Sequence, residues 1–161
     1  MEHFLTGVTI PPQSVVAGYW PVKSELDVMP LLLELIKRGH RCCLPQVTDF
    51  KRPLAFREWH EGAKMTDGRF GIRQPDPETC DPVLPGVILV PLLGFDGRGQ
   101  RLGYGSGFYD RTFDSLKGHK YLRIGVAYDI QRLEEVPIGP YDVPMNMIIT
   151  EKTIYHFRTG P

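Results

Sequence analysis

The sequence predicts an α/β fold, a three-layer sandwich in which a mostly parallel central sheet is flanked by helices. Three runs, at residues 15–20, 87–95 and 122–128, are rich in Val, Ile and aromatic residues and are bounded by Gly or Pro. The near-continuous apolarity of residues 87–90 is typical of a strand that is covered on both faces of a parallel sheet. Because 161 residues suit one compact domain, we expect a single domain over residues 1–161.

Four shorter segments are further strand candidates, at residues 41–47, 54–59, 147–150 and 153–157. The last two segments follow each other so closely that they predict a hairpin or a sheet edge. The stretch 75–86, which is rich in Pro and Gly, is typical of a surface connection within one domain.

A helix is predicted after the first strand run, because apolar residues recur there at helical spacing: Leu26, Met29, Leu33 and Ile36. Pro30 decides where this helix begins, since proline is tolerated only in the first turn. Capping by Asp27 satisfies that condition, whereas capping by Ser24 would put Pro30 inside the helix. Gly39 would end the helix. Glu25 then lies in the loop after the first strand, at the sheet edge where open α/β sheets bind their ligands.

The composition argues against several classes of function. The 19 basic and 19 acidic residues balance, so no overall field favours nucleic acid or an acidic membrane. The apolar runs are much shorter than the roughly 20 residues that cross a bilayer, and we expect a cytoplasmic protein. Three cysteines without zinc-site spacing and five scattered histidines predict core thiols and no structural metal.

A glycine-rich segment at residues 94–111 carries most of the chemical signal. It follows the most apolar strand run and leads into a second predicted helix at residues 107–116, so its backbone N–H groups would face an anion. Glycine spacing alone leaves an alternative open, in which the glycines serve only a tight turn. Arg101 and Arg111 favour phosphate binding, and Asp110 offers a hard oxygen ligand for magnesium.

Residues 101–111, with the sequence Arg-Leu-Gly-Tyr-Gly-Ser-Gly-Phe-Tyr-Asp-Arg, closely resemble the signature of the 5-formyltetrahydrofolate cyclo-ligase (5,10-methenyltetrahydrofolate synthetase) family. The likeness extends over residues 15–45, 68–75, 87–96 and 125–150; residues 68–75 resemble the family's G-x-F-G-I-x-x-P element. The resemblance implies an enzyme, an ATP- and magnesium-dependent ligase that converts 5-formyltetrahydrofolate to 5,10-methenyltetrahydrofolate through a phosphorylated formyl intermediate. A non-catalytic member of the family that binds folate or nucleotide is the alternative.

The resemblance also assigns roles to individual residues. Arg101 and Tyr109 would be catalytic, and Asp110 and Asp142 would hold magnesium. The ATP-binding positions would be Arg101, Leu102, Gly103, Tyr104, Gly105, Ser106, Gly107, Phe108 and Tyr109. The folate-binding positions would be Trp20, Glu25, Tyr104, Gly105, Ser106, Gly107 and Phe108. For five of these residues a purely structural interpretation stays open, as core, turn or solvated side chains: Trp20, Glu25, Tyr109, Asp110 and Asp142.

The beginning of the chain departs from the family's pattern. Family members usually begin with a basic helix that contributes Lys and Arg to ATP, whereas residues 1–13 contain neither. Either the start is shortened relative to other members or this member binds nucleotide more weakly. Each lost charge-assisted contact to ATP costs about 1.5–3 kcal/mol of binding free energy. The activity of this member is therefore in question. Arg73 is a candidate for partial compensation. We expect a small-molecule substrate and neither nucleic acid nor membrane as partner, and the sequence defines no oligomeric state.

Overall fold

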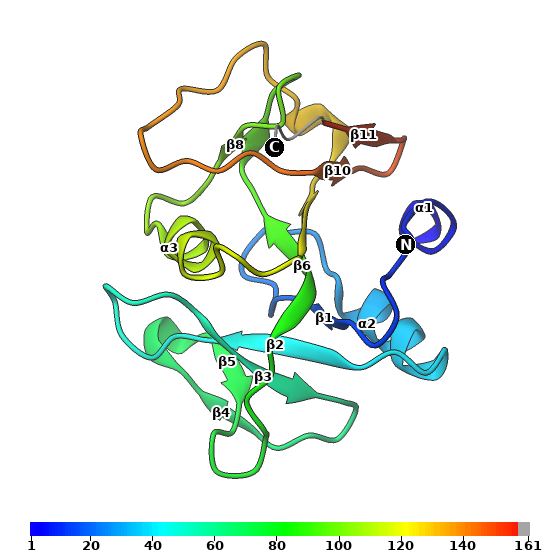
Figure 1. Ribbon diagram of the computed structural model, residues 1–161, viewed down its shortest axis with the longest axis vertical. Helices are drawn as coiled ribbons and strands as arrows, with labels where there is room; N and C mark the ends of the chain where they lie inside the picture. Colours follow the sequence, from blue (N-terminus) through cyan, green and yellow to red (C-terminus); the bar gives the residue numbers. More distant parts are fainter. Residues whose placement is uncertain (158–161) are drawn as a thin grey trace.

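The computed structural model describes residues 1–157, in which one seven-stranded sheet forms the centre of the molecule (Figure 1). The strand order is β11-β10-β9-β6-β1-β2-β3. The five inner strands are parallel: β10 (Met147–Ile149), β9 (Leu122–Val126), β6 (Pro85–Pro91), β1 (Val15–Ala17) and β2 (Cys42–Gln46). Antiparallel strands close both edges, β11 (Ile154–His156) and β3 (Ala55–Trp59). The mostly parallel sheet and the terminal hairpin are thus confirmed.

Helices cover both faces of the sheet, and alternate side chains of each strand face opposite layers. Val16 packs into the layer with α1 (Glu2–Gly7) and α2 (Met29–Lys37), whereas Val15 and Ala17 face α3 (Phe108–Ser115). Figure 1 shows α1 and α2 on one side of the sheet and α3 on the other. The predicted three-layer α/β architecture is confirmed. Full burial of each large apolar side chain in these layers stabilises the fold by about 1.5–3 kcal/mol.

The start of α2 follows from Pro30, although the N-cap is Val28 and not Asp27 as predicted. The Met29 N–H donates to Asp27 Oδ1 at 2.9 Å, and Pro30 occupies the first turn, where it breaks no intrahelical hydrogen bond. The helix ends before Gly39, which has a φ of +87° and donates its N–H to the Ile36 carbonyl. The second predicted helix is also confirmed, since α3 follows Gly107 and ends before Leu116.

The strand expected over residues 87–95 is in fact two strands, which corrects the prediction. Strand β6 ends at Pro91, which has no N–H with which to continue the ladder, and β7 (Gly94–Phe95) pairs instead with β8 (Arg101–Leu102). Asp96 is 1% exposed and fixes the β7–β8 turn by accepting the N–H groups of Arg98 and Gln100. A two-stranded hairpin therefore lies between the strand and the helix, where a direct glycine turn was expected.

Some elements carried no clear signal in the sequence. These are α1, the hairpin of β4 (Met65–Asp67) and β5 (Arg73–Pro75), and two short 3-10 turns, η1 (Arg69–Gly71) and η2 (Asp129–Gln131). The expected strand at residues 15–20 is also shorter than predicted, because it ends at Ala17. Helix α1 contains no Lys or Arg.

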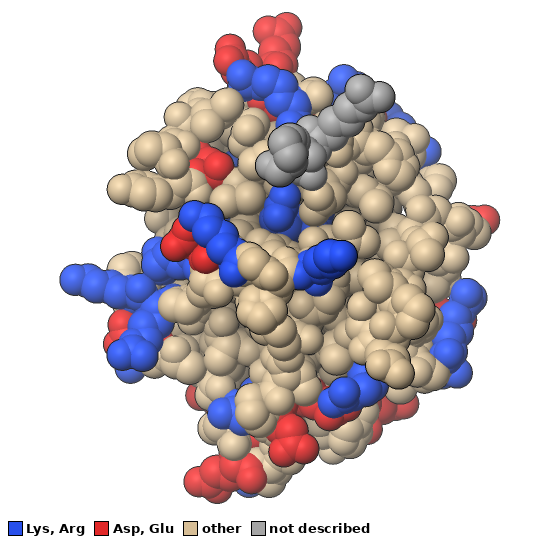
Figure 2. All heavy atoms as spheres, in the orientation of Figure 1, with Lys and Arg blue, Asp and Glu red and all other residues tan. Residues whose placement is uncertain are grey.

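Surface and core chemistry agree with the composition. Basic and acidic side chains are interspersed over the face in Figure 2, as the balanced charge suggests. The three cysteines are buried and unpaired, which confirms them as core thiols. Among residues 1–157, no helix has the length and apolarity needed to cross a membrane.

Candidate active site

The sheet reverses its winding between two neighbouring strands, β1 and β6. From β1 the chain passes through α2 to β2 on one side, whereas from β6 it continues to β9 on the other side. The loops that leave the carboxyl ends of such strands diverge and leave a crevice between them, which is the usual ligand site of open α/β sheets. The loop with Glu25 and the glycine-rich segment leave this edge of the sheet side by side.

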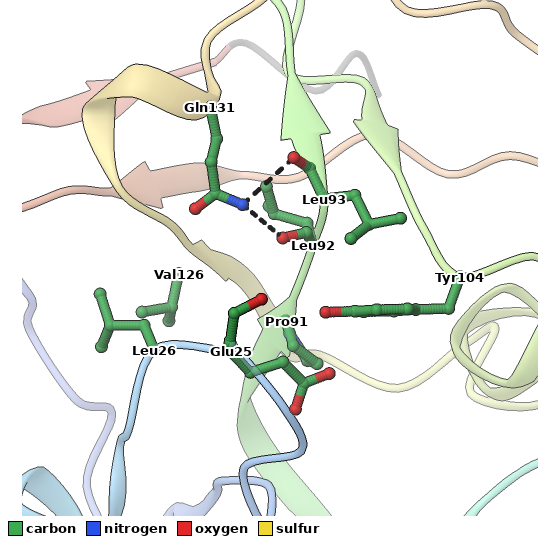
Figure 3. A pocket seen from close by; sticks show the side chains of 9 residues that line it. Glu25, Leu26, Pro91, Leu92, Leu93, Tyr104, Val126 and Gln131 are labelled. Carbon is green, nitrogen blue, oxygen red and sulfur yellow. Dashed lines mark hydrogen bonds between the residues drawn. The ribbon is translucent and has the colours of Figure 1, made fainter.

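A pocket lies in this crevice and is drawn in Figure 3. Its walls come from the loop after β1, the end of β6, the glycine-rich segment, β9 and η2: Ser24, Glu25, Leu26, Pro91, Leu92, Leu93, Tyr104, Val126 and Gln131. Gln131 donates to the carbonyls of Leu92 and Leu93 and so holds the chain that leaves β6. Tyr104 directs its phenol oxygen toward the pocket.

Glu25 is held in place by its own loop. Its Oε2 accepts the Val22 N–H at 2.8 Å, and the Tyr19 hydroxyl donates to the Leu26 carbonyl at 2.7 Å. Burial raises the pKa of the Glu25 carboxyl, and the Tyr104 hydroxyl, which lines the same pocket, acts against this rise. The structure therefore brings Glu25 and Tyr104 together, although they lie far apart in the sequence.

Two further tyrosines surround this carboxylate. Burial raises the pKa of Tyr19 and of Tyr109 far above the usual range, and the charge of Glu25 raises both further. A phenol that stays protonated donates a hydrogen bond and does not act as a base near neutral pH. Tyr109 also packs beside Phe113, with ring centroids 6.1 Å apart. It therefore has the packing of a core residue as well as a position beside the site.

Trp20 lies three residues beyond the end of β1 and is partly buried. It packs against the same layer of the core as α2, and the guanidinium carbon of Arg73 lies 5.5 Å from the centre of its ring. The ring thus belongs partly to the core and is covered partly by a cation from β5. Arg73 lies beside a predicted folate-binding residue, where it adds a positive charge to the site.

Glycines in the loop between β8 and α3 make room for guanidinium groups. A Cβ on Gly103 would lie 2.7 Å from Arg101 Nη1, and a Cβ on Gly107 would lie 2.8 Å from Arg111 Nη1. Gly107 precedes α3 with a φ of +67°, a left-handed conformation that other residues rarely adopt. The positive φ therefore favours glycine at position 107, and a side chain at either position would displace the neighbouring guanidinium group.

Arg101 is paired inside the protein. Its Nη2 donates to Asp110 Oδ1 at 2.7 Å, and the two side chains are only 8% and 18% exposed. Its guanidinium carbon also lies 5.8 Å from the centre of the Tyr109 ring. The Nε atom is buried without a hydrogen-bond partner in the described structure, which leaves one donor of this cation unused.

The two predicted magnesium ligands lie in different surroundings. Asp110 belongs to the first turn of α3 and is bound to Arg101, whereas Asp142 closes a turn by accepting the Gly139 N–H at 2.7 Å. Within residues 1–157, no group of three or more His, Cys, Asp or Glu residues gathers as a ready set of metal ligands. The predicted magnesium role of both aspartates stays a prediction.

The sequence analysis missed residues that the fold brings to this site. Gln131 lines the pocket and Tyr19 bonds to the carbonyl of its neighbour Leu26, while Phe50 lies between Phe70 and Phe108, the last a residue of the glycine-rich segment. Phe70 lies within the G-x-F-G-I-x-x-P element, so that motif could have singled it out. Gln131 follows no motif, and only the folding of η2 over the end of β6 reveals it.

This fold and site define an α/β protein with a ligand crevice at the switch point of a parallel sheet and a glycine-rich segment at its edge. The family model of the 5-formyltetrahydrofolate cyclo-ligase family matches residues 2–151, and the chain belongs to this family. It is 34% identical over 158 residues to the 5-formyltetrahydrofolate cyclo-ligase of Escherichia coli K12, covering 93% of this chain and 86% of that protein. The enzyme of that name from Mycolicibacterium smegmatis is 36% identical over 163 residues, covering 94% and 80%.

Solved structures agree with this assignment. The NMR structure of Aquifex aeolicus 5,10-methenyltetrahydrofolate synthetase superposes with a TM-score of 0.75 at 34% identity, covering 92% of this chain and 74% of that one. A 5,10-methenyltetrahydrofolate synthetase from Mycoplasma pneumoniae superposes with a TM-score of 0.67 at 27% identity, covering 91% and 77%.

Proposed function

We propose that this chain is a cytoplasmic ligase that converts 5-formyltetrahydrofolate to 5,10-methenyltetrahydrofolate with ATP and magnesium. The observation that carries the proposal is the meeting of Glu25 with Tyr104 at the sheet's switch point, because it joins the expected folate and nucleotide sites. The names of the Escherichia coli and Aquifex aeolicus relatives support the same reaction. Unpaired, buried cysteines are typical of a reducing compartment such as the cytoplasm.

Glu25 and Trp20 would bind the folate. A reduced pterin carries amino and ring N–H donors, and a half-buried carboxylate with a raised pKa gains most from such donors. The Trp20 ring would cover the pterin face, with Arg73 on it as a neighbouring positive charge. The remaining folate contacts would come from residues 104–108.

Residues 101–109 would bind the ATP phosphates, and one observation fits this assignment. Arg101 Nε is a buried donor without a partner, and an anion beside it would satisfy that donor. Magnesium binds through one or two carboxylates plus phosphate oxygens and water, so Asp110 and Asp142 would suffice without a larger cluster. Bound ATP supplies the phosphoryl group that activates the formyl oxygen, and magnesium neutralises its charge.

The chemistry asks the protein mainly for positioning and for compensation of charge. After the formyl oxygen has accepted the phosphoryl group, the neighbouring folate nitrogen closes the ring and phosphate leaves. Arg101 would offer fixed positive charge, and Tyr109, whose raised pKa keeps it protonated, would donate a hydrogen bond to a developing negative charge. Neither step requires a protein nucleophile.

The test is the appearance of methenyltetrahydrofolate, which has its own absorbance, when 5-formyltetrahydrofolate, ATP and magnesium are mixed with the chain. We expect product only when all three are present, with phosphate released in equal amount. Binding of folate and ATP without product would identify the chain as a non-catalytic binding member of the family.

A further inference from the structure

Three phenylalanines from three separate segments meet at the edge of the site. The Phe50 ring lies 6.0 Å, centre to centre, from both Phe70 and Phe108, edge to face in each pair. Phe50 belongs to the loop after the carboxyl end of β2, Phe70 to the loop between β4 and β5, and Phe108 to the start of α3. In Figure 1 the loop between β2 and β3 reaches toward α3. Arg111 joins these segments by donating to the carbonyls of Phe50 and Ser106.

This aromatic group is exposed although its rings are large and apolar. Phe50 is 53% exposed and Phe70 is 65% exposed. Phe70 also has a φ of +63° and a ψ of +20°, a left-handed conformation that is strained for a residue with a bulky side chain. Residues that are both strained and exposed persist chiefly at functional sites, because no burial within the protein offsets the energy of the strained backbone. The arrangement therefore suggests that a ligand covers the rings.

Exposed cations lie close in the sequence to Phe50 and Phe70. The two loops and the start of β5 contribute four exposed basic residues, Lys51, Arg52, Arg69 and Arg73, against two exposed acidic residues, Asp49 and Asp67. Within residues 1–157 none of them forms a salt bridge. We call the three phenylalanines and these four cations the basic rim.

The opposite flank of the site has the opposite charge. Sheet order puts the loop after β9 on the far side of the β1–β6 pair from the loop after β2. Residues 127–146 of that flank contain one basic residue, Arg132, and four acidic residues: Asp129, Glu134, Glu135 and Asp142. A ligand with an aromatic ring followed by carboxylates would therefore be drawn toward the basic rim and repelled from the other flank.

We propose that the basic rim binds the p-aminobenzoylglutamate end of the folate substrate. This inference rests on the proposed function, which puts the pterin at Trp20 and Glu25. Arg73 connects the two regions, because it covers Trp20 and begins the strand that follows Phe70. The benzoyl ring then lies against Phe50 and Phe70, and the two glutamate carboxylates face the rim cations. Aromatic packing and charge pairing together define an end of the substrate that the pterin pocket does not reach.

The test compares two ligands that differ only in the glutamate. Calorimetric titration without ATP measures the dissociation constants of 5-formyltetrahydrofolate and of 5-formyltetrahydropteroate, which lacks the glutamate. We expect the folate to bind more tightly to the wild-type chain. Lys51→Ala and Arg69→Ala should each weaken folate binding about 2- to 5-fold and leave pteroate binding unchanged, since exposed ion pairs are worth little individually. Lys120→Ala is the matched control, because this exposed lysine precedes β9 at the amino end of the sheet.

Phe70→Gly tests the aromatic part of the rim without endangering the fold. Glycine accepts a φ of +63° freely, so the relieved strain offsets the larger entropy of the unfolded chain, and the variant should melt close to the wild-type temperature. We expect it to bind both ligands about 3- to 10-fold more weakly, because both carry the benzoyl ring. A ring that serves only the structure would instead lower the melting temperature and leave both dissociation constants unchanged.

Other outcomes overturn the proposal separately from the proposed function. Equal affinity of the wild-type chain for folate and pteroate would eliminate the glutamate subsite. Rim variants that weaken ATP binding and spare folate would assign the rim to the nucleotide instead. Because the titration needs no turnover, a chain that binds folate through the rim but forms no methenyltetrahydrofolate would contradict only the proposed catalysis.

Discussion

The glycine-rich segment and the basic rim both border the site, yet they treat positive charge in opposite ways. Arg101 of the first region is 8% exposed and is paired with Asp110 at 2.7 Å. The rim cations are exposed and form no salt bridge within residues 1–157. One region holds its charge in a fixed position inside the protein, and the other leaves its charges to solvent.

The difference teaches which function each region can serve. A buried guanidinium with a fixed partner keeps its orientation during a reaction and is poorly screened by salt, so it suits a role in a transition state. Exposed cations are screened and mobile, so they suit the attraction and weak binding of a charged ligand. We therefore expect changes in the first region to affect both turnover and stability, and changes in the rim to affect affinity alone.

Arg101→Ala should have the largest effect. We expect turnover to fall about 10- to 100-fold, because a charge-assisted contact is lost, and the free energy of unfolding to fall by about 1–3 kcal/mol, because Asp110 loses its partner. Steady-state rates and urea unfolding measure the two effects. Arg41→Ala is the control, since it breaks an exposed ion pair with Glu58 at the amino end of the sheet. Unchanged turnover in a folded variant would contradict the role of Arg101 in phosphate binding.

Asp110→Asn tests whether the partner of Arg101 also holds magnesium. We expect the magnesium concentration at half-maximal rate to rise about 10-fold, because an amide oxygen is a weaker ligand than a carboxylate oxygen. The measurement is a magnesium titration of the rate at saturating ATP and folate. Asp114→Asn on the same helix is the control, since Asp114 is exposed and pairs with Lys117. The same magnesium dependence in both variants would assign the metal to another residue.

Glu25→Gln should weaken folate binding more than ATP binding. We expect the folate KM to rise about 3- to 10-fold, because an amide accepts hydrogen bonds from the pterin less strongly than a carboxylate. Equal losses for both ligands would indicate a purely structural role.

The same variant has a pH signature. The pKa of Glu25 is raised above 4.5 in the folded state, so its contribution to stability is fully present below about pH 4.5 and is lost as pH rises through the folded pKa. The melting temperature of Glu25→Gln relative to that of the wild type should therefore increase between pH 4 and pH 7. A difference that does not change with pH would mean that this carboxyl is not buried as described.

Arg69→Ala should have the smallest effect on the fold. We expect its free energy of unfolding to differ from that of the wild type by less than about 0.5 kcal/mol, because the side chain is exposed and forms no salt bridge within residues 1–157. Urea unfolding measures this difference. A large loss of stability would show that the rim is held together like the glycine-rich segment and would remove the contrast between the two regions.

Much of the fold follows from local patterns. The apolar runs located the inner strands to within a few residues, and Pro30 located the start of α2. The run at residues 87–95 predicts one strand because apolar residues continue past Pro91. The hydrogen-bond ladder between β6 and β9 nevertheless ends at Pro91. The β4–β5 hairpin was missed because its strands are three residues long and carry no alternating pattern. Strand pairs this short are stabilised by contacts with the rest of the protein, which a single sequence does not reveal.

The residues of the site also fall into two groups, those that local sequence patterns reveal and those that only the fold brings together. A motif identified the glycine-rich segment, and the break before Pro30 put Glu25 in a loop at the ligand edge of the sheet. The pairing of Arg101 with Asp110 could not be predicted, because either residue could equally have faced a ligand. The meeting of Phe50, Phe70 and Phe108 was also hidden, since nothing local links the three segments.

The sequence by itself determined the layers of this protein, the order of its main elements and the segment that carries its chemistry. These follow from hydrophobic periodicity and from the restricted backbone of proline and glycine, which act over a few neighbouring residues. Only the tertiary structure decided which charges are neutralised and which stay free for a ligand. That outcome depends on burial and on distances of a few ångströms between residues far apart in the chain, because electrostatic energy varies steeply with both.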